Sequence, residues 1–390
     1  MSMKNTFNWP NFSPDEIKLT SEVLKSNNVN YLFGKQGKKF ENAFASFSDC
    51  KYALAVANGT LALDLCLRSI GLREGDEVLV TSRSYVASGM SISLLGAKPI
   101  WCDVDLDSQN ISLDEIKSKC TEKTKAILCV HFAGYPCDMH EIIAFAKKNN
   151  LYTIEDCAQA HGATIRGKSV GSFGDISAWS FCNDKIMSTG GEGGMVTTNS
   201  RKLYKFISSF NNHGKNLKKY YDLKNPKSFP YIHDKLGSNY RLTEFQSSIG
   251  IYQLKQMKRW NAIRTRNANE IICAIEGSNL IDVPILKEGY QHAWYKLYLT
   301  INKDFLKKSW SLNKIITALN AKAVSSSFGG CGEMYREKAF SGSKKKVHLK
   351  NARYLERNSL MILIHPTITH TEIRRRAKIL NSVLAAATIK

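Results

Sequence analysis

Trp179-Ser180-Phe181-Cys182-Asn183-Asp184-Lys185 is the stretch that decides the fold, together with the glycine-rich run Gly190-Gly191-Glu192-Gly193-Gly194 that follows it. The first stretch ends an apolar run with a hydroxyl, a carboxamide and a lysine. Upstream, a second apolar run, Leu151-Tyr152-Thr153-Ile154, ends in Glu155-Asp156 and is followed by Gln159. Ligands of open α/β sheets bind beyond the carboxyl ends of the strands, so the acid and the lysine can face one pocket.

The first half of the chain alternates segments with strand-like and helix-like patterns. Capping boxes at Ser13-Pro14-Asp15-Glu16 and Ser112-Leu113-Asp114-Glu115 mark two helix starts. Alternation of this kind predicts a mostly parallel sheet with helices on both faces. The expected strands are 52–57, 77–81, 98–104, 126–132, 151–155, 176–181 and 195–198, and the expected helices between them include 60–70, 86–95 and 139–149.

The pattern changes after a long helix that we expect from about Thr243 to Ala274. A strand at 294–301 and a helix at 311–319 follow, and Thr369 caps a final helix. We therefore expect a large domain of residues 1–255 and a smaller C-terminal α+β domain of residues 256–390.

Composition places the chain among ordinary globular proteins, with 390 residues, 43% hydrophobic and 23% charged. No apolar run reaches the roughly 18 residues of a membrane helix, and no apolar segment of a signal peptide follows Lys4. The ten cysteines are scattered, without a Cys-x-x-Cys pair. We therefore expect reduced thiols in a cytoplasmic protein, no membrane span and no metal site.

The net charge of +21 is concentrated in the second half of the chain. Residues 1–200 hold 20 Lys and Arg against 22 Asp and Glu, whereas residues 201–390 hold 35 against 12. Such an excess can attract nucleic acid, an anionic membrane surface or an acidic small substrate, or it can simply keep a surface solvated. The run Arg374-Arg375-Arg376 has few aromatic neighbours, so we expect no nucleic-acid partner.

The polar residues at the strand ends match the needs of one cofactor, pyridoxal 5′-phosphate (PLP). The ring nitrogen of PLP must stay protonated beside a carboxylate, which Asp156 can supply, and its aldehyde needs an amine, which Lys185 can supply. Its phosphate needs hydroxyls and N–H groups at a helix start, as in Asn58-Gly59-Thr60. Tyr85 can pack on the ring face and Gln159 can donate to the ring hydroxyl. The sequence therefore predicts PLP as the cofactor.

The glycine-rich run 190–194 raises a different possibility, a dinucleotide site. It lacks the Gly-x-Gly-x-x-Gly spacing and lies between strand-like segments instead of opening a helix. We interpret it as a tight turn that lets the backbone approach the cofactor.

Several short motifs follow one another along the chain. They are Asn58-Gly59-Thr60-x-Ala62-Leu63, Ser84-Tyr85, His131-Phe132-x-Gly134, Glu155-Asp156-x-Ala158-Gln159-Ala160-His161-Gly162, Ser180-Phe181-x-x-x-Lys185, Gly191-Glu192-Gly193-Gly194, Asn212-His213-Gly214 and Gly237-x-Asn239-Tyr240-Arg241. In this order the motifs resemble the DegT/StrS-type PLP-dependent sugar-nucleotide aminotransferase family. The resemblance covers roughly residues 10–260. The span from Lys185 to Glu192 is one residue longer than usual, which leaves the subgroup and the sugar open, and Cys157 and Cys182 replace commoner residues.

The resemblance implies a fold-type I aminotransferase that acts as a homodimer with shared active sites. Lys185 would form the Schiff base with the cofactor and act as the catalytic residue, and Asp156 would pair with the pyridinium nitrogen. Asn239 would reach the phosphate of the neighbouring subunit's cofactor. The other cofactor-binding residues would be Gly59, Thr60 and Ser180 at the phosphate, Tyr85 stacked on the ring and Gln159 at the ring hydroxyl.

The resemblance also implies a reaction, in which an amino group passes from an amino acid, glutamate, to a nucleotide-linked keto-sugar, a 4-keto-6-deoxyhexose. Two alternatives are a PLP-dependent sugar dehydratase on the same fold, in which histidine replaces the Schiff-base lysine, and a non-catalytic regulatory homologue. The nucleotide, the sugar configuration and the aminated carbon stay open. So does the pathway, which could serve surface polysaccharide or antibiotic glycosylation.

Overall fold

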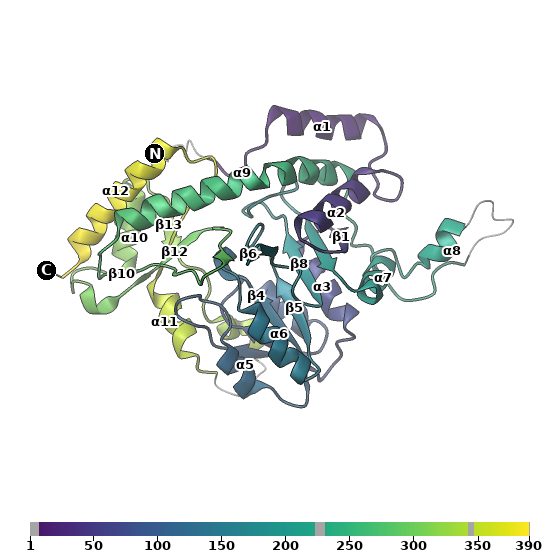
Figure 1. The fold of residues 1–390 in the computed structure, drawn as a ribbon, viewed down its shortest axis with the longest axis horizontal. Coiled ribbons are helices and arrows are strands. Elements are labelled where there is room, and N and C mark those ends of the chain that lie inside the picture. The colour runs from purple at the N-terminus through teal and green to yellow at the C-terminus, as the bar shows by residue number, and fades with distance from the viewer. Residues whose placement is uncertain (1–7, 223–230, 342–346, 390) are drawn as a thin grey trace.

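A seven-stranded sheet forms the centre of the large N-terminal part of the chain, in the order β1-β9-β8-β5-β4-β2-β3 (Figure 1). The computed structural model describes residues 8–222, 231–341 and 347–389. Four of the strand pairs are parallel, and β9 is antiparallel to both neighbours, so the predicted mostly parallel sheet is confirmed. The strands are β1 Tyr52–Val56, β2 Glu77–Thr81, β3 Lys98–Cys102, β4 Thr124–Val130, β5 Tyr152–Asp156, β8 Ile176–Ser180 and β9 Gly194–Thr198.

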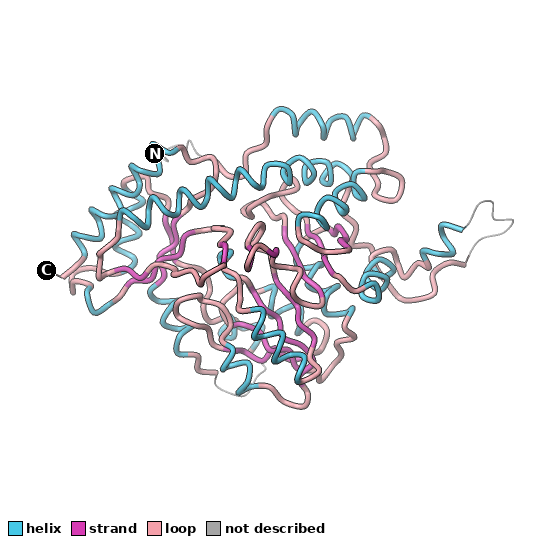
Figure 2. The backbone as a smooth tube through the Cα atoms, in the orientation of Figure 1, coloured by secondary structure: helices cyan, strands magenta, loops and turns pink. Residues whose placement is uncertain are grey.

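Helices cover both faces of this sheet, as the tube view also shows (Figure 2). Successive side chains of a strand point to opposite faces, and the apolar residues divide accordingly. Val80 and Leu128 belong to the cluster that includes α3, whereas Leu79 and Ile127 belong to the cluster that includes α6. The helices of this part are α1 Pro14–Lys25, α2 Gln36–Phe47, α3 Gly59–Ser69, α4 Ala87–Ser93, α5 Leu113–Lys119, α6 Met139–Lys148, α7 Arg201–Phe210 and α8 Leu217–Asp222.

The two predicted capping boxes have different outcomes. At α1 the Ser13 hydroxyl accepts from the Glu16 N–H, and the Glu16 carboxylate accepts from the Ser13 N–H, so this box is confirmed. Helix α5 does begin after Ser112, but the predicted box there is wrong. Its Glu115 carboxylate instead accepts from the Asp103 N–H at the end of the neighbouring strand and pairs with Lys119 at 2.6 Å.

Helix α9, Glu244–Ala274, runs along the molecule and contacts α1 and α2 with one end and α12 with the other. The domain boundary that we expect at 255/256 lies inside this helix and stays a prediction. Beyond α9, four antiparallel strands form the second sheet in the order β10-β12-β14-β13. The predicted cap at Thr369 is confirmed. The remaining elements are β6 Thr164–Ile165, β7 Lys168–Ser169, β10 Ile281–Asp282, β11 Tyr290–Gln291, β12 Leu297–Ile301, β13 Ser326–Phe328, β14 Ser359–Ile362, α10 Leu312–Ala321, α11 Lys350–Asn358 and α12 His370–Ala387.

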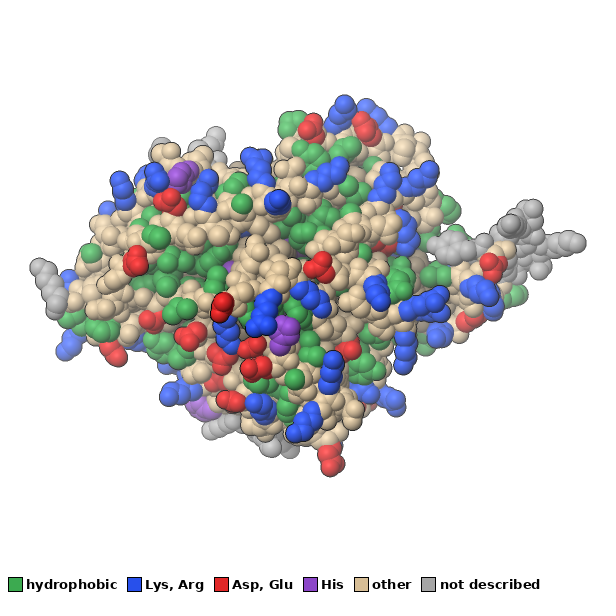
Figure 3. Space-filling view, in the orientation of Figure 1, with side chains coloured by type: hydrophobic (Ala, Val, Ile, Leu, Met, Phe, Trp, Pro, Cys, Tyr) green, Lys and Arg blue, Asp and Glu red, His purple; other side chains and the backbone are tan. Residues whose placement is uncertain are grey.

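The surface carries the excess of positive charge. On the face drawn in Figure 3, Lys and Arg side chains are distributed over the whole outline instead of forming one patch. Among the helices of the described ranges, none combines the length and the apolar character needed to cross a membrane.

Candidate active site

A cavity of about 640 Å³ lies beyond the carboxyl ends of β2, β4, β5 and β8. This size is typical of a small-molecule site. Seven of the eight predicted site residues line it, and Asn239 does not. The seven are Gly59, Thr60, Tyr85, Asp156, Gln159, Ser180 and Lys185.

Asp156, the last residue of β5, presents a buried carboxylate to this cavity. It accepts from the Ser88 hydroxyl at 2.9 Å and from the Ala158 N–H at 3.2 Å. Burial raises the pKa of Asp156, while these two donors and the Lys185 charge act in the lowering direction. A buried carboxylate gains most from a cation placed beside it, which is what a protonated ring nitrogen offers.

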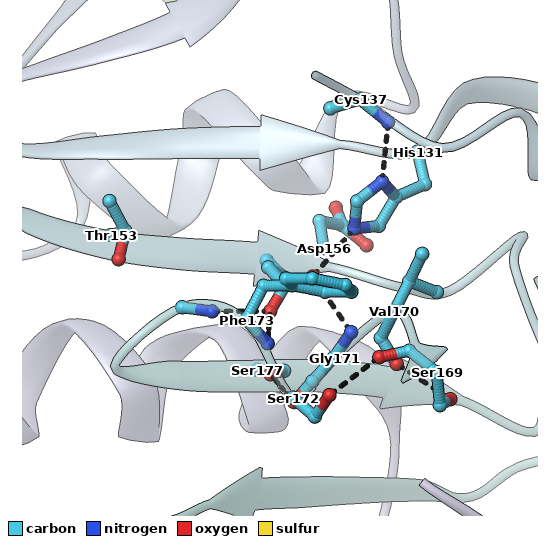
Figure 4. A network of polar contacts seen from close by, with 12 residues as sticks. His131, Cys137, Thr153, Asp156, Ser169, Val170, Gly171, Ser172, Phe173 and Ser177 are labelled. Atoms are coloured by element: carbon cyan, nitrogen blue, oxygen red, sulfur yellow. Dashed lines mark hydrogen bonds and ion pairs between the residues drawn. The ribbon is translucent and has the colours of Figure 1, made fainter. Parts of the chain in front are cut away.

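A second buried carboxylate, that of Glu155, fixes the end of β5 next to Asp156. Glu155 accepts from three N–H groups of the loop 171–174, at 2.6 to 2.9 Å, and from His131 Nε2 at 3.0 Å. His131 Nδ1 accepts from the Cys137 N–H, so the ring proton lies on Nε2, toward Glu155. Figure 4 shows the His131 ring between Cys137 and the strand that ends in Asp156. These bonds fix the direction in which Asp156 points.

The start of α3 forms a narrow cradle on the wall of the same cavity. Asn58 caps the helix by accepting from the Leu61 N–H at 2.9 Å. A Cβ on Gly59 would lie 2.6 Å from the Ser180 Cβ, and a Cβ on Gly194 would lie 2.4 Å from the Asn58 carbonyl oxygen. Gly194 therefore lets the glycine-rich run pack closely against the start of α3, and the approach of this run to the cofactor stays a prediction. A helix start with free N–H groups beside a serine hydroxyl suits a phosphate.

Replacing Gly59 by alanine should weaken PLP binding about 10- to 100-fold, because the added methyl group overlaps Ser180 and widens the cradle. Titration of the protein with PLP, followed by absorbance, measures the affinity. Ser69→Ala at the other end of α3 serves as the control. Unchanged affinity in the Gly59 variant would show that the phosphate lies elsewhere.

Lys185 projects into the cavity with its side chain 15% exposed. Its Nζ lies 3.8 Å from Asp184 Oδ1 and 4.9 Å from the centre of the Tyr295 ring. The Tyr295 hydroxyl and Lys296 Nζ both donate to Asp184 Oδ2. Burial opposes ionisation of Asp184, but the Lys185 charge and these donors outweigh it and lower the pKa of Asp184. The lysine therefore sits beside a carboxylate and an aromatic ring.

The remaining predicted residues are placed as follows. Gln159 Oε1 accepts from the Ala133 N–H at 2.7 Å, which leaves its amide nitrogen as the side-chain donor. Tyr85 is 69% exposed on the cavity wall. Asn239 is exposed, pairs through its backbone with Asn212, and is not among the residues that line the cavity of its own chain.

Some cavity residues were not predicted. Ser88 lies one turn beyond Tyr85, and its place near the start of the helix that follows β2 could have pointed to it. Three further residues reach the cavity from β12 of the second sheet and the segment just before it, and no local pattern marks them: Tyr295, Lys296 and Tyr298.

The donor set fits PLP. It combines an amine, a buried carboxylate and a phosphate cradle within one cavity, and an aromatic ring on its wall. PLP carries an aldehyde, a pyridinium nitrogen and a phosphate in one molecule. The aldehyde needs the amine, the nitrogen needs the carboxylate and the phosphate needs the cradle.

Comparison with known proteins agrees with this site. The model of the DegT/DnrJ/EryC1/StrS aminotransferase family matches residues 10–381. A solved aminotransferase from Psychrobacter cryohalolentis has a TM-score of 0.95 and 45% identity, over 98% of this chain and 99% of that chain. GDP-perosamine synthase of Escherichia coli O157:H7 is 43% identical over 63% of this chain and 65% of that enzyme. UDP-N-acetyl-3-dehydro-alpha-D-glucosamine 3-aminotransferase of Acidithiobacillus ferrooxidans is 32% identical over 96% of this chain and 95% of its own.

The match spans nearly the whole chain, and the fold is that of the fold-type I aminotransferases. This protein belongs to the DegT/DnrJ/EryC1/StrS aminotransferase family and is a PLP-dependent aminotransferase.

Proposed function

We propose that this enzyme moves an amino group from glutamate to a nucleotide-linked 4-keto-6-deoxyhexose, in amino-sugar and polysaccharide biosynthesis. The observation that carries the proposal is the meeting of Lys185 and Asp156 in one cavity at the sheet edge. The names of the relatives, GDP-perosamine synthase and a UDP-linked glucosamine 3-aminotransferase, support a sugar-nucleotide acceptor.

In this proposal Lys185 and Asp156 divide the chemistry. PLP, when bound, supplies an electron sink that allows the Cα–H bond of the donor to break. Lys185 anchors the cofactor, takes the proton from the donor's α-carbon and delivers it to the cofactor carbon that receives the amino group. Asp156 keeps the proton on the ring nitrogen, since a carboxylate favours the charged ring over the neutral one.

The other predicted residues hold the cofactor in this proposal. Gly59, Thr60 and Ser180 bind the phosphate, Tyr85 covers the ring face and Gln159 donates to the ring hydroxyl. All five line the cavity.

The excess of Lys and Arg in residues 201–390 supports attraction of an anionic diphosphate substrate. All ten cysteines are free thiols, which supports a reducing compartment such as the cytoplasm.

The two alternatives make different predictions. A dehydratase of this fold would carry histidine at the anchoring position, whereas position 185 is lysine. A non-catalytic homologue would not convert PLP to pyridoxamine phosphate when glutamate is added.

The proposal is tested by a panel of nucleotide keto-sugars with glutamate as donor, read by mass spectrometry. The proposal predicts that at least one keto-sugar of the panel is converted to its amino sugar. If the mass of every keto-sugar stayed unchanged, the proposal would be contradicted.

Asn239 suggests a test of the homodimer. We propose that it completes the phosphate site of the partner subunit, since it is exposed and lies outside its own cavity. In a mixed dimer of Lys185→Ala and Asn239→Ala chains, one of the two sites would keep both residues. An equal mixture should therefore regain about a quarter of the wild-type activity, because half of the dimers in it are mixed. Each variant alone is the control, and activity of the mixture no higher than the mean of the two would contradict shared sites.

A further inference from the structure

The N-terminal segment 8–16 is tied to the backbone beside Lys185. The indole Nε1 of Trp9 donates to the carbonyl oxygen of Lys185 at 2.7 Å. One residue earlier, the Asn8 carbonyl accepts from the Thr367 hydroxyl at 3.0 Å, just before α12. In Figure 1 this segment runs from the side of α12 along α9 to α1. The segment therefore connects the residues just before α12, in the C-terminal part of the chain, to the backbone of Lys185.

The ring of Trp9 is held on several sides. It packs edge-on against Trp260 at 5.0 Å and stacks with His365 at 6.3 Å, both measured between ring centres. The buried guanidinium of Arg264 lies 5.1 Å from the Trp9 ring and donates to the Tyr295 carbonyl at 3.0 Å. Since Tyr295 contacts both Lys185 and Asp184, the same cluster supports the residue that faces the lysine. An indole enclosed in this way has little rotational freedom, so its N–H has a defined direction.

A second link runs through helix α9. The buried Gln253 accepts from the Ser188 N–H at 2.7 Å and donates to the buried Glu16 carboxylate at 3.0 Å. Glu16 is also the residue whose carboxylate completes the capping box of α1 with Ser13. The segment 185–188 is thus hydrogen-bonded at both ends. Its first residue is bonded to Trp9 of the N-terminal segment, and its last residue to Gln253, which that segment orients through Glu16.

We propose that Trp9 is a positioning residue for Lys185, and that residues 8–16 form a strap that fixes the lysine's backbone during transamination. The inference rests on the proposed role of Lys185. The Lys185 amine must first anchor the cofactor and then transfer a proton. The backbone that carries it must therefore be held in place, because small displacements of a reacting group slow the reaction strongly. Trp9 does not line the cavity, so it acts through the lysine and not on a substrate.

The test uses holoenzyme and three variants. Trp9→Phe keeps an aromatic ring but removes the N–H together with the five-membered half of the indole. Thr367→Val releases the strap at Asn8, the residue before Trp9. Trp310→Phe is the matched control, since Trp310 packs against Lys314 in the small domain. Stopped-flow absorbance gives the limiting rate and the half-saturating donor concentration of the donor half-reaction. Amide hydrogen exchange of peptides that cover 185–188 gives a readout that needs no turnover.

We expect Trp9→Phe to lower the limiting rate about two- to tenfold, the range that the loss of one hydrogen bond supports, with the half-saturating concentration unchanged. Exchange at 185–188 should rise in both strap variants and not in Trp310→Phe. An unchanged rate and unchanged exchange in Trp9→Phe would overturn the proposal, as would equal effects in Trp310→Phe. The sugar plays no part in this half-reaction, so a wrong sugar assignment would leave the result standing. A wild-type holoenzyme whose PLP is bound to a residue other than Lys185 would overturn the proposed function and the strap together.

Discussion

Replacing Lys185 by alanine should reduce kcat by at least about a thousandfold while PLP still binds. The amine is the only group in the proposal that both anchors the cofactor and moves the proton, and the loss of a positioned acid–base group alone costs about 10²- to 10⁴-fold. The cradle at Gly59 and the Asp156 carboxylate stay intact in this variant and should hold PLP without a covalent bond. Steady-state kinetics and a PLP titration measure the two effects separately.

Lys296→Gln is the control for this experiment. Lys296 lines the same cavity and also contacts Asp184, but its Nζ is bonded to that carboxylate at 3.0 Å. This variant should keep its PLP covalently attached. Turnover of Lys185→Ala within tenfold of the wild type would remove the lysine from its proposed role.

Replacing Asp156 by asparagine should lower kcat about 10²- to 10³-fold, the range expected when a buried charge loses its partner. Asparagine has nearly the same shape. Its Oδ1 can accept from the Ala158 N–H and its amide nitrogen can donate to the Ser88 hydroxyl oxygen, but it cannot hold a proton on the ring nitrogen. The absorbance of the bound cofactor should also change its pH dependence, because the ring nitrogen would lose its proton more easily.

The matched control is Asp282→Asn, at an exposed site on β10 of the second sheet. It should leave kcat and the cofactor spectrum unchanged. A loss of less than threefold in Asp156→Asn would show that the ring nitrogen is protonated by another group, or that the ring is bound in another orientation.

Much of the sheet and the centre of the site could be predicted from local pattern. The strand at 77–81 was predicted with its observed bounds, because its apolar run is flanked by clear turn residues. Asp156 and Lys185 were expected in one pocket because each follows a strand, and β5 and β8 are indeed parallel neighbours. The periodicity of apolar residues reports burial and strand direction, which is the information that this inference needs.

The contacts that orient the site could not be predicted in the same way. Ser88 bonds Asp156 across 68 residues, Tyr295 bonds Asp184 across 111, and Trp9 bonds Lys185 across 176. No spacing rule connects residues so far apart, since their meeting depends on how the helices and the second sheet pack. The failed box at Ser112 has the same origin, because a tertiary donor took the carboxylate that a local rule assigns to the helix start.

Borohydride reduction of the wild-type holoenzyme, followed by peptide mass mapping, tests most directly whether PLP is anchored where the fold brings the amine and the acid together. The account predicts one reduced adduct, on Lys185, and none in Lys185→Ala. An adduct on Lys296, or a holoenzyme that contains PLP but forms no adduct, would contradict it.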